Sequence, residues 1–293
     1  MSQFRNIINF VRPIQLLLSL LTYGFGLGLA RYLGTTLLIE TQFYGGVIVI
    51  FLLAASSLLI EYFRPPNEPV GSAETRNERE ELRSYFLIIS ITLIAIVAIV
   101  VFLLIRDGFL YGEAAFVLLL FILLALANAV PPIRLANRGL SELSTSIQIS
   151  SLSPTLAFLL QFGSFHRLLT IYTIPLLLLA LAYFLALNFP AYAEDLKYER
   201  KSMLLSLTWQ RAVPLHNSLL IAAYLFFASI PFLGVPVQLV WPAFLSLPIA
   251  AYQVYTLRNL ADGAKPIWPV FVATATAIIG ITSYLIALTF WLR

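Results

Sequence analysis

The sequence predicts an all-α fold: a polytopic membrane protein built as a nine-transmembrane-helix bundle. Two observations predict this fold class. Of the 293 residues, 60% are hydrophobic and only 11% are charged, whereas a soluble domain carries about a quarter charged residues. Apolar runs of about 20 residues, the length of a helix that crosses the hydrocarbon core of a bilayer, also recur along the whole chain. These runs are continuously apolar rather than alternating, which favours helices over a β-barrel.

Each of the nine apolar runs is long enough for one membrane crossing. The first follows Arg12 and has the length of a retained span, not of a cleavable signal peptide. The fifth is rich in serine, whose hydroxyls can bond within a helix or to its neighbours, so we interpret it as an interior packing helix. Only Gly234-Val235-Pro236 separates the seventh and eighth runs, which are also consistent with one broken unit. The runs lie at 14–33, 43–63, 85–105, 112–130, 142–162, 171–193, 216–234, 237–257 and 267–291.

The rest of the composition excludes several kinds of site. The chain has no cysteine, which excludes disulfides, thiolate zinc sites and cysteine nucleophiles. Two histidines leave little room for an imidazole-based metal site, and a net charge of +4 is too small and too scattered to indicate nucleic acid binding. We expect the lipid bilayer as a partner and no obligate protein partner. Residues 1–293 are predicted to form a single integral-membrane domain.

The basic residues predict the orientation of the bundle, because cytoplasmic connections are enriched in lysine and arginine. Fourteen of the 18 lie on the side that holds the N-terminus and the connections after spans two, four, six and eight. We therefore expect a cytoplasmic N-terminus, an external C-terminus and a location in the plasma (inner) membrane. The fourteen are Arg5, Arg12, Arg64, Arg76, Arg79, Arg83, Arg134, Arg138, Lys197, Arg200, Lys201, Arg211, Arg258 and Lys265.

Two long connections on this side carry most of the polar chemistry. The first follows span two, begins with Glu61-Tyr62-Phe63-Arg64 and continues through Pro65-Pro66, which should end the helix near Arg64. The second follows span six and includes Asp195-Leu196-Lys197-Tyr198-Glu199. Four spans separate the two connections, an even number, so both must lie on the same side of the membrane. Ionisable side chains close to the hydrocarbon core are costly, so they indicate a functional site. Charged side chains at the interface can also simply anchor helix ends.

Four local patterns resemble the UbiA superfamily of intramembrane prenyltransferases. Arg12-Pro13 precedes a first span that contains four small residues, and the connection 131–142 resembles the family's proline-proline…arginine-glycine-leucine-glycine-glutamate segment. Glu61-Tyr62-Phe63 lies where the first acidic motif would lie, and the stretch 187–203 resembles the second acidic motif in its menaquinone-branch form. The four small residues are Gly24, Gly26, Gly28 and Ala30. The resemblance covers essentially the whole chain.

The chain departs from both acidic motifs. In the first motif Ile60 replaces an asparagine and Arg64 replaces an acid, while Glu68 stands for the last acid. In the second motif Ala191 replaces the first aspartate and Asp195 is the second. A shifted register that pairs Asp195 with Glu199 restores two acids four residues apart. The departures therefore leave the number and the identity of the metal ligands open.

The resemblance implies transfer of a polyprenyl group from a prenyl diphosphate to an aromatic acceptor of the quinone-precursor type, with Mg²⁺ as cofactor. Magnesium takes oxygen ligands and bridges carboxylates to phosphates, and the leaving pyrophosphate needs positive charge around it. Glu61 and Asp195 are the predicted catalytic residues. The predicted metal ligands are Glu61, Glu68, Asp195 and Glu199. The predicted substrate-binding residues are Arg64, Arg134, Arg138, Lys197, Arg200, Lys201, Tyr62 and Tyr192.

Two other functions remain open from the sequence. The missing acids at positions 64 and 191 are consistent with a catalytically weak or silent homologue that binds a prenyl lipid or a quinone. A transporter for small solutes is less well supported, because the polar residues gather at one face instead of the bilayer midplane.

Overall fold

The computed structural model describes residues 9–65, 68, 70, 75–110 and 112–293. The described chain is helical, and nine of its helical units are long and apolar enough to cross a membrane. Arg5 and Pro66, which were part of the sequence interpretation, lie outside the described residues. The predicted class is therefore confirmed: the chain is a multi-pass, all-α membrane protein.

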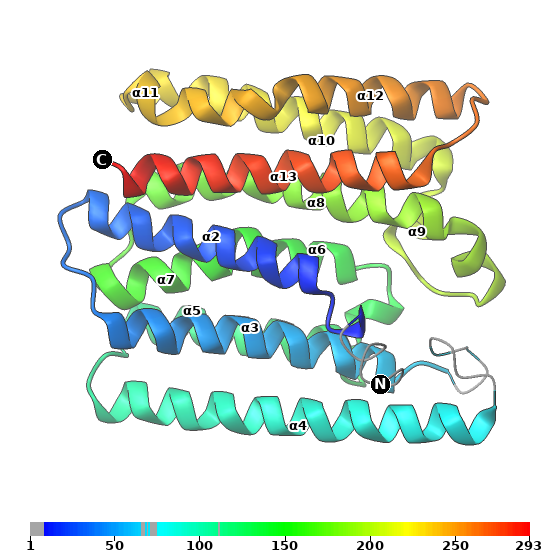
Figure 1. The fold of residues 1–293 in the computed structure, drawn as a ribbon, viewed down its shortest axis with the longest axis horizontal. Coiled ribbons are helices and arrows are strands. Elements are labelled where there is room, and N and C mark those ends of the chain that lie inside the picture. The colour runs from blue at the N-terminus through cyan, green and yellow to red at the C-terminus, as the bar shows by residue number, and fades with distance from the viewer. Residues whose placement is uncertain (1–8, 66–67, 69, 71–74, 111) are drawn as a thin grey trace.

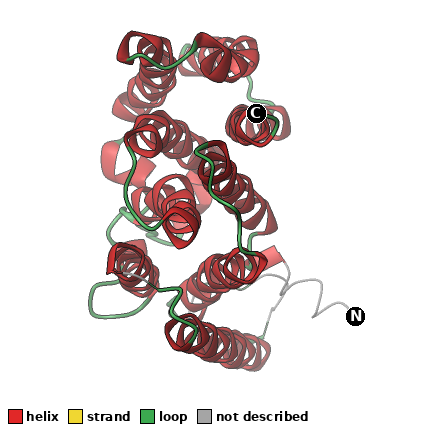
Figure 2. Cartoon of the chain, turned by 90° about the vertical axis from the view of Figure 1, so that its left-hand side faces the viewer, coloured by secondary structure: helices red, strands yellow, loops and turns green. Residues whose placement is uncertain are grey.

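All nine predicted spans are present in order. They are formed by α2 (Pro13–Tyr32), α3 (Ile39–Tyr62), α4 (Arg76–Arg106), α5 (Gly112–Ala129), Ser141–Phe162, α8 (Arg167–Lys197), Trp209–Leu233, Val237–Ala261 and α13 (Trp268–Trp291). The helices run roughly parallel to one another, so the view in Figure 2 looks along most of their axes. Spans seven and eight are separate helices and not one broken unit. They contain α10 (Trp209–Ser229) and α12 (Leu247–Ala261).

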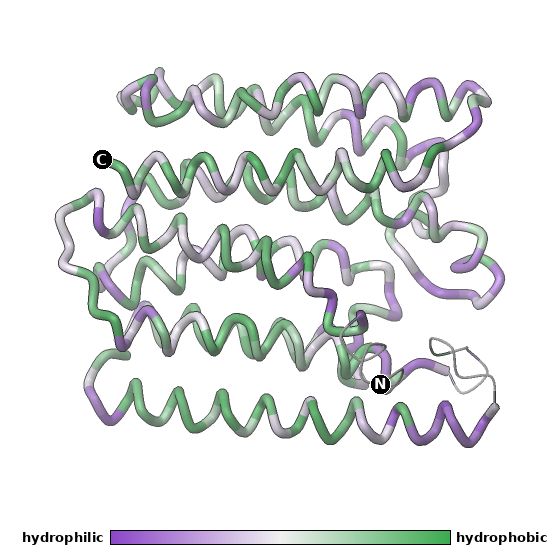
Figure 3. The backbone as a smooth tube through the Cα atoms, in the orientation of Figure 1, coloured by the Kyte–Doolittle hydropathy of each residue, from purple (hydrophilic) through white to green (hydrophobic). Residues whose placement is uncertain are grey.

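The two ends of the bundle differ in polarity. Helices α3, α5 and α8 all end at the right-hand side of Figure 1, where the connections before α4 and after α8 also lie. The hydrophilic stretches gather at this end of the chain trace (Figure 3). We call it the pocket end, defined by Tyr62 at the end of α3 and Lys197 at the end of α8. The expectation that the two polar connections share one side is confirmed.

Local signals explain the helix boundaries at the pocket end. Helix α2 starts with Pro13, whose fixed φ and missing N–H suit the first helical position. Helix α3 ends at Tyr62, close to the predicted stop before the prolines. Helix α4 begins at Arg76 because Thr75 and Glu78 form a capping box. The charged stretch 76–83 is therefore the first part of the helix that forms the third span.

The fifth span is an interior helix, as its serines indicated. It consists of α6 (Ser141–Ile147), a π-helical segment (Gln148–Leu152) and α7 (Ser153–Phe162). Hydroxyl groups join it to α2: the Thr22 hydroxyl donates to the Ile149 carbonyl (2.5 Å), and the Ser153 hydroxyl donates to the Ser19 carbonyl (3.0 Å). The first contact gives a donor to a carbonyl of the π-helical segment, where the regular helical pattern is interrupted.

Candidate functional site

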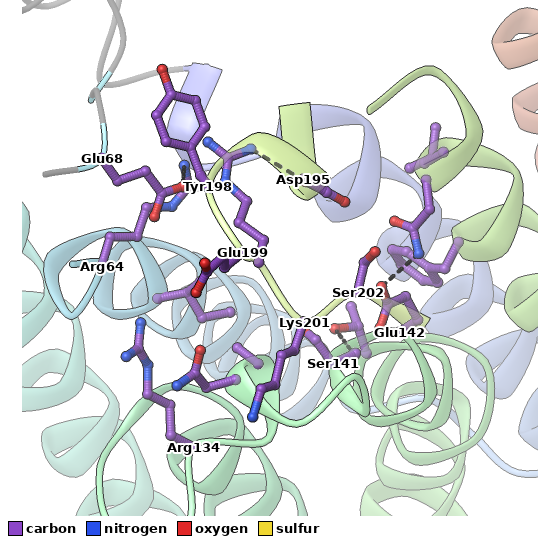
Figure 4. A pocket seen from close by; sticks show the side chains of 18 of the residues that line it. Arg64, Glu68, Arg134, Ser141, Glu142, Asp195, Tyr198, Glu199, Lys201 and Ser202 are labelled. Atoms are coloured by element: carbon purple, nitrogen blue, oxygen red, sulfur yellow. Dashed lines mark hydrogen bonds and ion pairs between the residues drawn. The ribbon is translucent and has the colours of Figure 1, made fainter. Parts of the chain in front are cut away.

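A cavity of about 400 Å³ opens at the pocket end. Its walls come from the start of α2, the ends of α3 and α8, the connection after α5, and the beginning of α6. Figure 4 shows its charged side chains converging from these separate elements. Arg64, Pro65 and Glu68 of the first polar connection line the same cavity as Asp195 and residues 198–202 of the second. The two connections, which the sequence predicted to lie on one side of the membrane, therefore meet at one cavity.

The first polar connection contributes a cluster of ion pairs. Arg64 contacts both glutamates of this segment, with its Nε 2.7 Å from Glu61 Oε2 and one terminal nitrogen 3.2 Å from Glu68 Oε1. Arg12 approaches Glu61 from α2 at 3.7 Å. Both glutamates are almost completely buried, with exposed fractions of 2% and 3%. Buried carboxylates of this kind need such cationic partners, because an unpaired buried charge is costly.

The second polar connection completes this network. Arg200 contacts Glu68 of the first connection through its Nε, and its terminal nitrogens lie 3.4 Å from Asp195 Oδ1 and 3.1 Å from Glu194 Oε1. A continuous chain of ion pairs therefore runs from Arg12 to Asp195. It joins the end of α3 to the end of α8 by charge contacts (Figure 4).

The pKa values of two arginines reflect this surrounding. Burial acts to lower the pKa of Arg200, but Glu68, Glu194 and Asp195 outweigh it and raise the pKa above its ordinary value. Burial lowers the pKa of Arg134, and Glu68 offsets only part of that effect. Of these two arginines, Arg134 therefore has less of its buried positive charge compensated by neighbouring carboxylates. Both remain charged at any physiological pH.

The connection after α5 and the start of α6 form another wall, which carries Arg134 and Glu142. Glu142 accepts hydrogen bonds on Oε1 from Asn188 Nδ2 of α8 (2.6 Å) and from the backbone N–H of Met203 (3.1 Å). Met203 starts the short helix α9 (Met203–Leu207). Glu142 thus fixes the second polar connection against α6.

The backbone at the cavity is strained. Four described residues other than glycine have a positive φ, and three of them line the cavity: Arg12 (58°), Arg134 (36°) and Glu199 (52°). Such conformations cost of order 1–3 kcal/mol each and concentrate at functional sites. The strain supports a functional interpretation of this end of the bundle.

The structure brings together most of the predicted site residues. Those that line the cavity are Arg64, Glu68, Arg134, Asp195, Glu199, Arg200 and Lys201. Glu61 lies directly behind Arg64, to which it is ion-paired. Glu199 is exposed and lies beyond the end of α8, so it does not share a helical face with Asp195.

Four predicted substrate-binding residues lie outside the cavity walls. Arg138 donates to the Pro132 carbonyl (3.3 Å), and the Lys197 ammonium lies over the ring of Tyr198 (5.1 Å). The ring of Tyr62 packs edge-on against Phe63, and the ring of Tyr192 packs edge-on against Trp209. The sequence placed them correctly near the motifs but did not reveal which way each side chain points.

Several cavity residues were not predicted as site residues. They are Arg12, Gln15, Glu142, Asn188 and Ser202. Arg12 begins the pattern before the first span, and Glu142 ends the segment 131–142. Both patterns resemble the UbiA family, so the resemblance could have identified these two residues as site residues. Asn188 lies in the stretch 187–203 that resembles the second acidic motif, whereas Gln15 is an ordinary polar residue within an apolar run, and only the fold shows that it faces the cavity.

The predicted metal ligands do not fit a pair of Mg²⁺ ions in this arrangement. Glu61 and Glu68 are bridged by Arg64, and Glu68 and Asp195 are bridged by Arg200. A guanidinium group thus occupies the position between each pair of carboxylates where a bridging cation would lie. Among the described residues, no group of three or more carboxylate, histidine or cysteine side chains is arranged to hold a metal ion. A metal site in this chain stays a prediction.

Comparison with known proteins gives a match at the level of the fold. No family model matches the chain, and no curated protein matches it by sequence. A UbiA homolog from Archaeoglobus fulgidus, solved with GPP and Mg²⁺, superimposes with a TM-score of 0.60 at 15% identity over 96% of this chain and 99% of that chain. The same homolog solved with DMAPP and Mg²⁺ gives 0.54 at 17% identity over 96% of this chain and 99% of that one.

A digeranylgeranylglyceryl phosphate synthase also matches, with a TM-score of 0.55 at 12% identity over 100% of this chain and 98% of that chain. The fold therefore defines the class: an integral-membrane helical bundle of the UbiA type. This chain has the fold of the UbiA superfamily along essentially its whole length.

Proposed function

We propose that this chain is an intramembrane prenyltransferase of the UbiA superfamily. Its substrate would be a prenyl diphosphate, and it would transfer the polyprenyl group to an aromatic acceptor of the quinone-precursor type. The single observation that carries the proposal is the cavity in which the two polar connections meet through Arg64, Glu68 and Arg200. That the fold neighbours were solved with GPP and DMAPP supports the substrate class.

The cationic residues of the cavity suit a diphosphate group. Five arginine and lysine side chains line it: Arg12, Arg64, Arg134, Arg200 and Lys201. A guanidinium group can bind two phosphate oxygens at once through its planar fork of N–H donors. Charge develops on the leaving diphosphate when the bond between C1 of the prenyl group and oxygen breaks, and fixed cations stabilise that charge best because they need no reorganisation.

Binding of a diphosphate would involve the ion-pair network. Arg64 and Arg200 each direct three of their five N–H groups to carboxylates in the free chain, so each can bind phosphate with its remaining N–H groups or by exchanging a carboxylate partner. Arg134 and Lys201 make no ion pair with a described carboxylate and are the first contacts available to the ligand.

The deeper wall of the cavity suits the prenyl group. Ile60, Phe184 and Leu187 line it with apolar side chains. The ring of Tyr198 also lines the cavity, and the Arg200 guanidinium lies over this ring. An allylic cation is stabilised by aromatic faces and by the exclusion of water. We place the reacting carbon between these apolar residues and the cationic side chains.

We also propose that the pocket end faces the cytoplasm, where the prenyl diphosphate would enter. Fourteen of the 18 lysines and arginines belong to the N-terminal segment and to the connections at this end. Enrichment in cytoplasmic connections is the usual distribution of these residues in membrane proteins.

A direct assay tests the proposal. The purified chain in lipid nanodiscs is incubated with a radiolabelled prenyl diphosphate and a panel of aromatic acceptors, with and without Mg²⁺. We expect transfer of label to one acceptor and its loss in Asp195→Ala, while Arg138→Ala, outside the cavity, keeps the activity. If no acceptor receives label, either with or without Mg²⁺, the result would contradict the proposed prenyltransferase activity.

A second candidate is a silent homologue that binds a prenyl lipid or a quinone. It is favoured by one observation: the carboxylates expected to serve catalysis are paired with arginines. Saturable diphosphate binding without turnover would support this alternative.

A further inference from the structure

Glu142 differs from the other buried carboxylates of the cavity. Glu61, Glu68 and Asp195 each pair with an arginine. Glu142 is also buried, with an exposed fraction of 8%, yet none of the described lysines and arginines forms an ion pair with it. Stabilisation by a cation therefore does not explain its presence.

The two oxygens of Glu142 have different surroundings. Oε1 accepts two hydrogen bonds, from the side chain of Asn188 and from the backbone of Met203. Oε2 is buried and accepts none from the described residues. A buried acceptor without a donor costs about 1–3 kcal/mol. The arrangement thus fixes the carboxylate through one oxygen and leaves the other without a partner.

The neighbourhood of Glu142 suits a neutral hydroxyl compound. Thr145, Asn188 and Ser202 line the cavity beside it, and all three carry uncharged polar groups. In Figure 4, Glu142 and Ser202 lie across the cavity from Arg64 and Glu68. The cavity therefore has one side with the Arg64–Glu68 pair, suited to a diphosphate, and one side on which uncharged polar groups lie beside Glu142, with Asp195 and Lys201 between the two sides.

We propose that Glu142 binds the hydroxyl group of the acceptor and takes its proton during prenyl transfer, an inference that rests on the proposed function. The torsion about Cγ–Cδ of a glutamate is soft, and rotation about it moves both oxygens together. In the proposed complex the carboxylate turns so that Oε2 accepts from the hydroxyl, and the side chain of Asn188 follows Oε1. This assigns an acceptor subsite and a general base to the wall formed by α6.

The step balances for a phenolic acceptor. The O–H bond breaks and its proton moves to Glu142 Oε2, while the electron pair shifts through the ring to the ortho carbon. That carbon bonds to C1 of the prenyl group, and the bond between C1 and oxygen breaks with its electron pair leaving on the diphosphate. The ring regains aromaticity when the hydrogen of that carbon moves to the oxygen. The net proton then leaves Glu142 for water.

Donor preference in binding tests the assignment without relying on turnover. The probes are 2-naphthol, which can donate a hydrogen bond, and 2-methoxynaphthalene, which can only accept one. Binding is measured to nanodiscs that hold the full chain, with empty nanodiscs subtracted. We expect the wild-type chain to bind the naphthol about tenfold more tightly, the value of one buried hydrogen bond.

The matched variant is Glu142→Gln. Its amide oxygen can keep the donors on Oε1, but its NH₂ group replaces an acceptor with a donor. We expect the naphthol preference to disappear or to reverse, while affinity for a prenyl diphosphate stays within twofold. Equal preference in wild type and variant would overturn the assignment. If Glu142→Gln does not fold, the absence of a naphthol preference in the wild type alone overturns it.

Turnover supplies the second measurement. In a chain that transfers prenyl groups, Glu142→Gln should lower kcat by about 100-fold or more, the contribution of a general base. Acceptors with a more acidic phenol should recover part of the loss, which a purely structural role of Glu142 would not permit. A wild-type chain that shows the naphthol preference but no turnover would contradict the proposed function and leave the subsite assignment standing.

Discussion

Glu68 and Arg200 form an ion pair at the pocket end, although 132 residues separate them in the sequence. Glu68 follows α3 and Arg200 follows α8, so this contact connects the two polar segments. Arg64 on one side and Asp195 on the other extend the contact into a network. The network is the structural reason to treat the two segments as one site.

Removing this pair should cost stability in a way that a surface pair does not. In a double-mutant cycle with Glu68→Gln and Arg200→Gln, we expect a coupling energy of about 1–3 kcal/mol, because both groups are largely buried and share a network. The control cycle uses Arg76 and Glu80, an exposed pair one helical turn apart (2.9 Å). It should give about 0.5 kcal/mol or less. Unfolding by SDS titration measures both, and equal couplings would contradict the prediction.

Magnesium should not bind to the free chain. The positions between the carboxylates are taken by Arg64 and Arg200, so a metal ion would first have to displace a guanidinium group. We expect the unfolding temperature without diphosphate to be the same in MgCl₂ and in NaCl of equal ionic strength. Saturable stabilisation by Mg²⁺ that disappears in Asp195→Asn would show a preformed metal site and refute this view.

The absence of cysteine allows a simple test of orientation. Ala264→Cys places a thiol in the exposed connection between α12 and α13, at the pocket end. Ser164→Cys places one in the exposed connection before α8, at the opposite end. With a membrane-impermeant maleimide on intact cells, we expect labelling of Cys at 164 and none at 264 until the cells are lysed. The reverse pattern would place the pocket end outside.

Gly26 should be intolerant of any side chain. A Cβ at this position would collide with the Pro154 carbonyl of α7, whereas a Cβ at Gly24, two residues earlier in α2, would meet nothing within 4 Å. We expect Gly26→Ala to lower the free energy of unfolding by about 1–3 kcal/mol. Gly24→Ala should leave it unchanged or raise it slightly, since alanine favours a helix. Similar effects of the two variants would contradict the close approach of α2 and α7.

The sequence predicted the fold well because span length and apolar composition are local properties. All nine spans were located, and the errors fall at polar helix ends. Helix α4 extends back to Arg76 through its capping box, and α8 continues to Lys197 with Pro190 inside it. These extensions lie where hydropathy no longer separates helix from loop, so an apolar run could not define them.

The site was predicted less completely, for a different physical reason. The even number of spans between the two polar connections placed Arg64 and Asp195 at one end of the bundle, but their partners depend on how distant segments converge. Glu68 and Arg200 form an ion pair although they are 132 positions apart in the sequence. Asn188 donates a hydrogen bond to Glu142, which is 46 positions away. No local pattern encodes such contacts. For the same reason the sequence did not show that Tyr62 and Tyr192 pack against Phe63 and Trp209 and do not line the cavity.

The most direct test of the central claim is equilibrium binding of a radiolabelled prenyl diphosphate to the full chain in nanodiscs. One variant from each polar segment, Arg64→Gln and Arg200→Gln, is compared with Arg138→Gln, which lies outside the cavity walls. We predict that each of the first two weakens binding about tenfold or more, the loss of a charge-assisted hydrogen bond, and that Arg138→Gln matches the wild type. Binding that is the same in all four proteins would contradict the account.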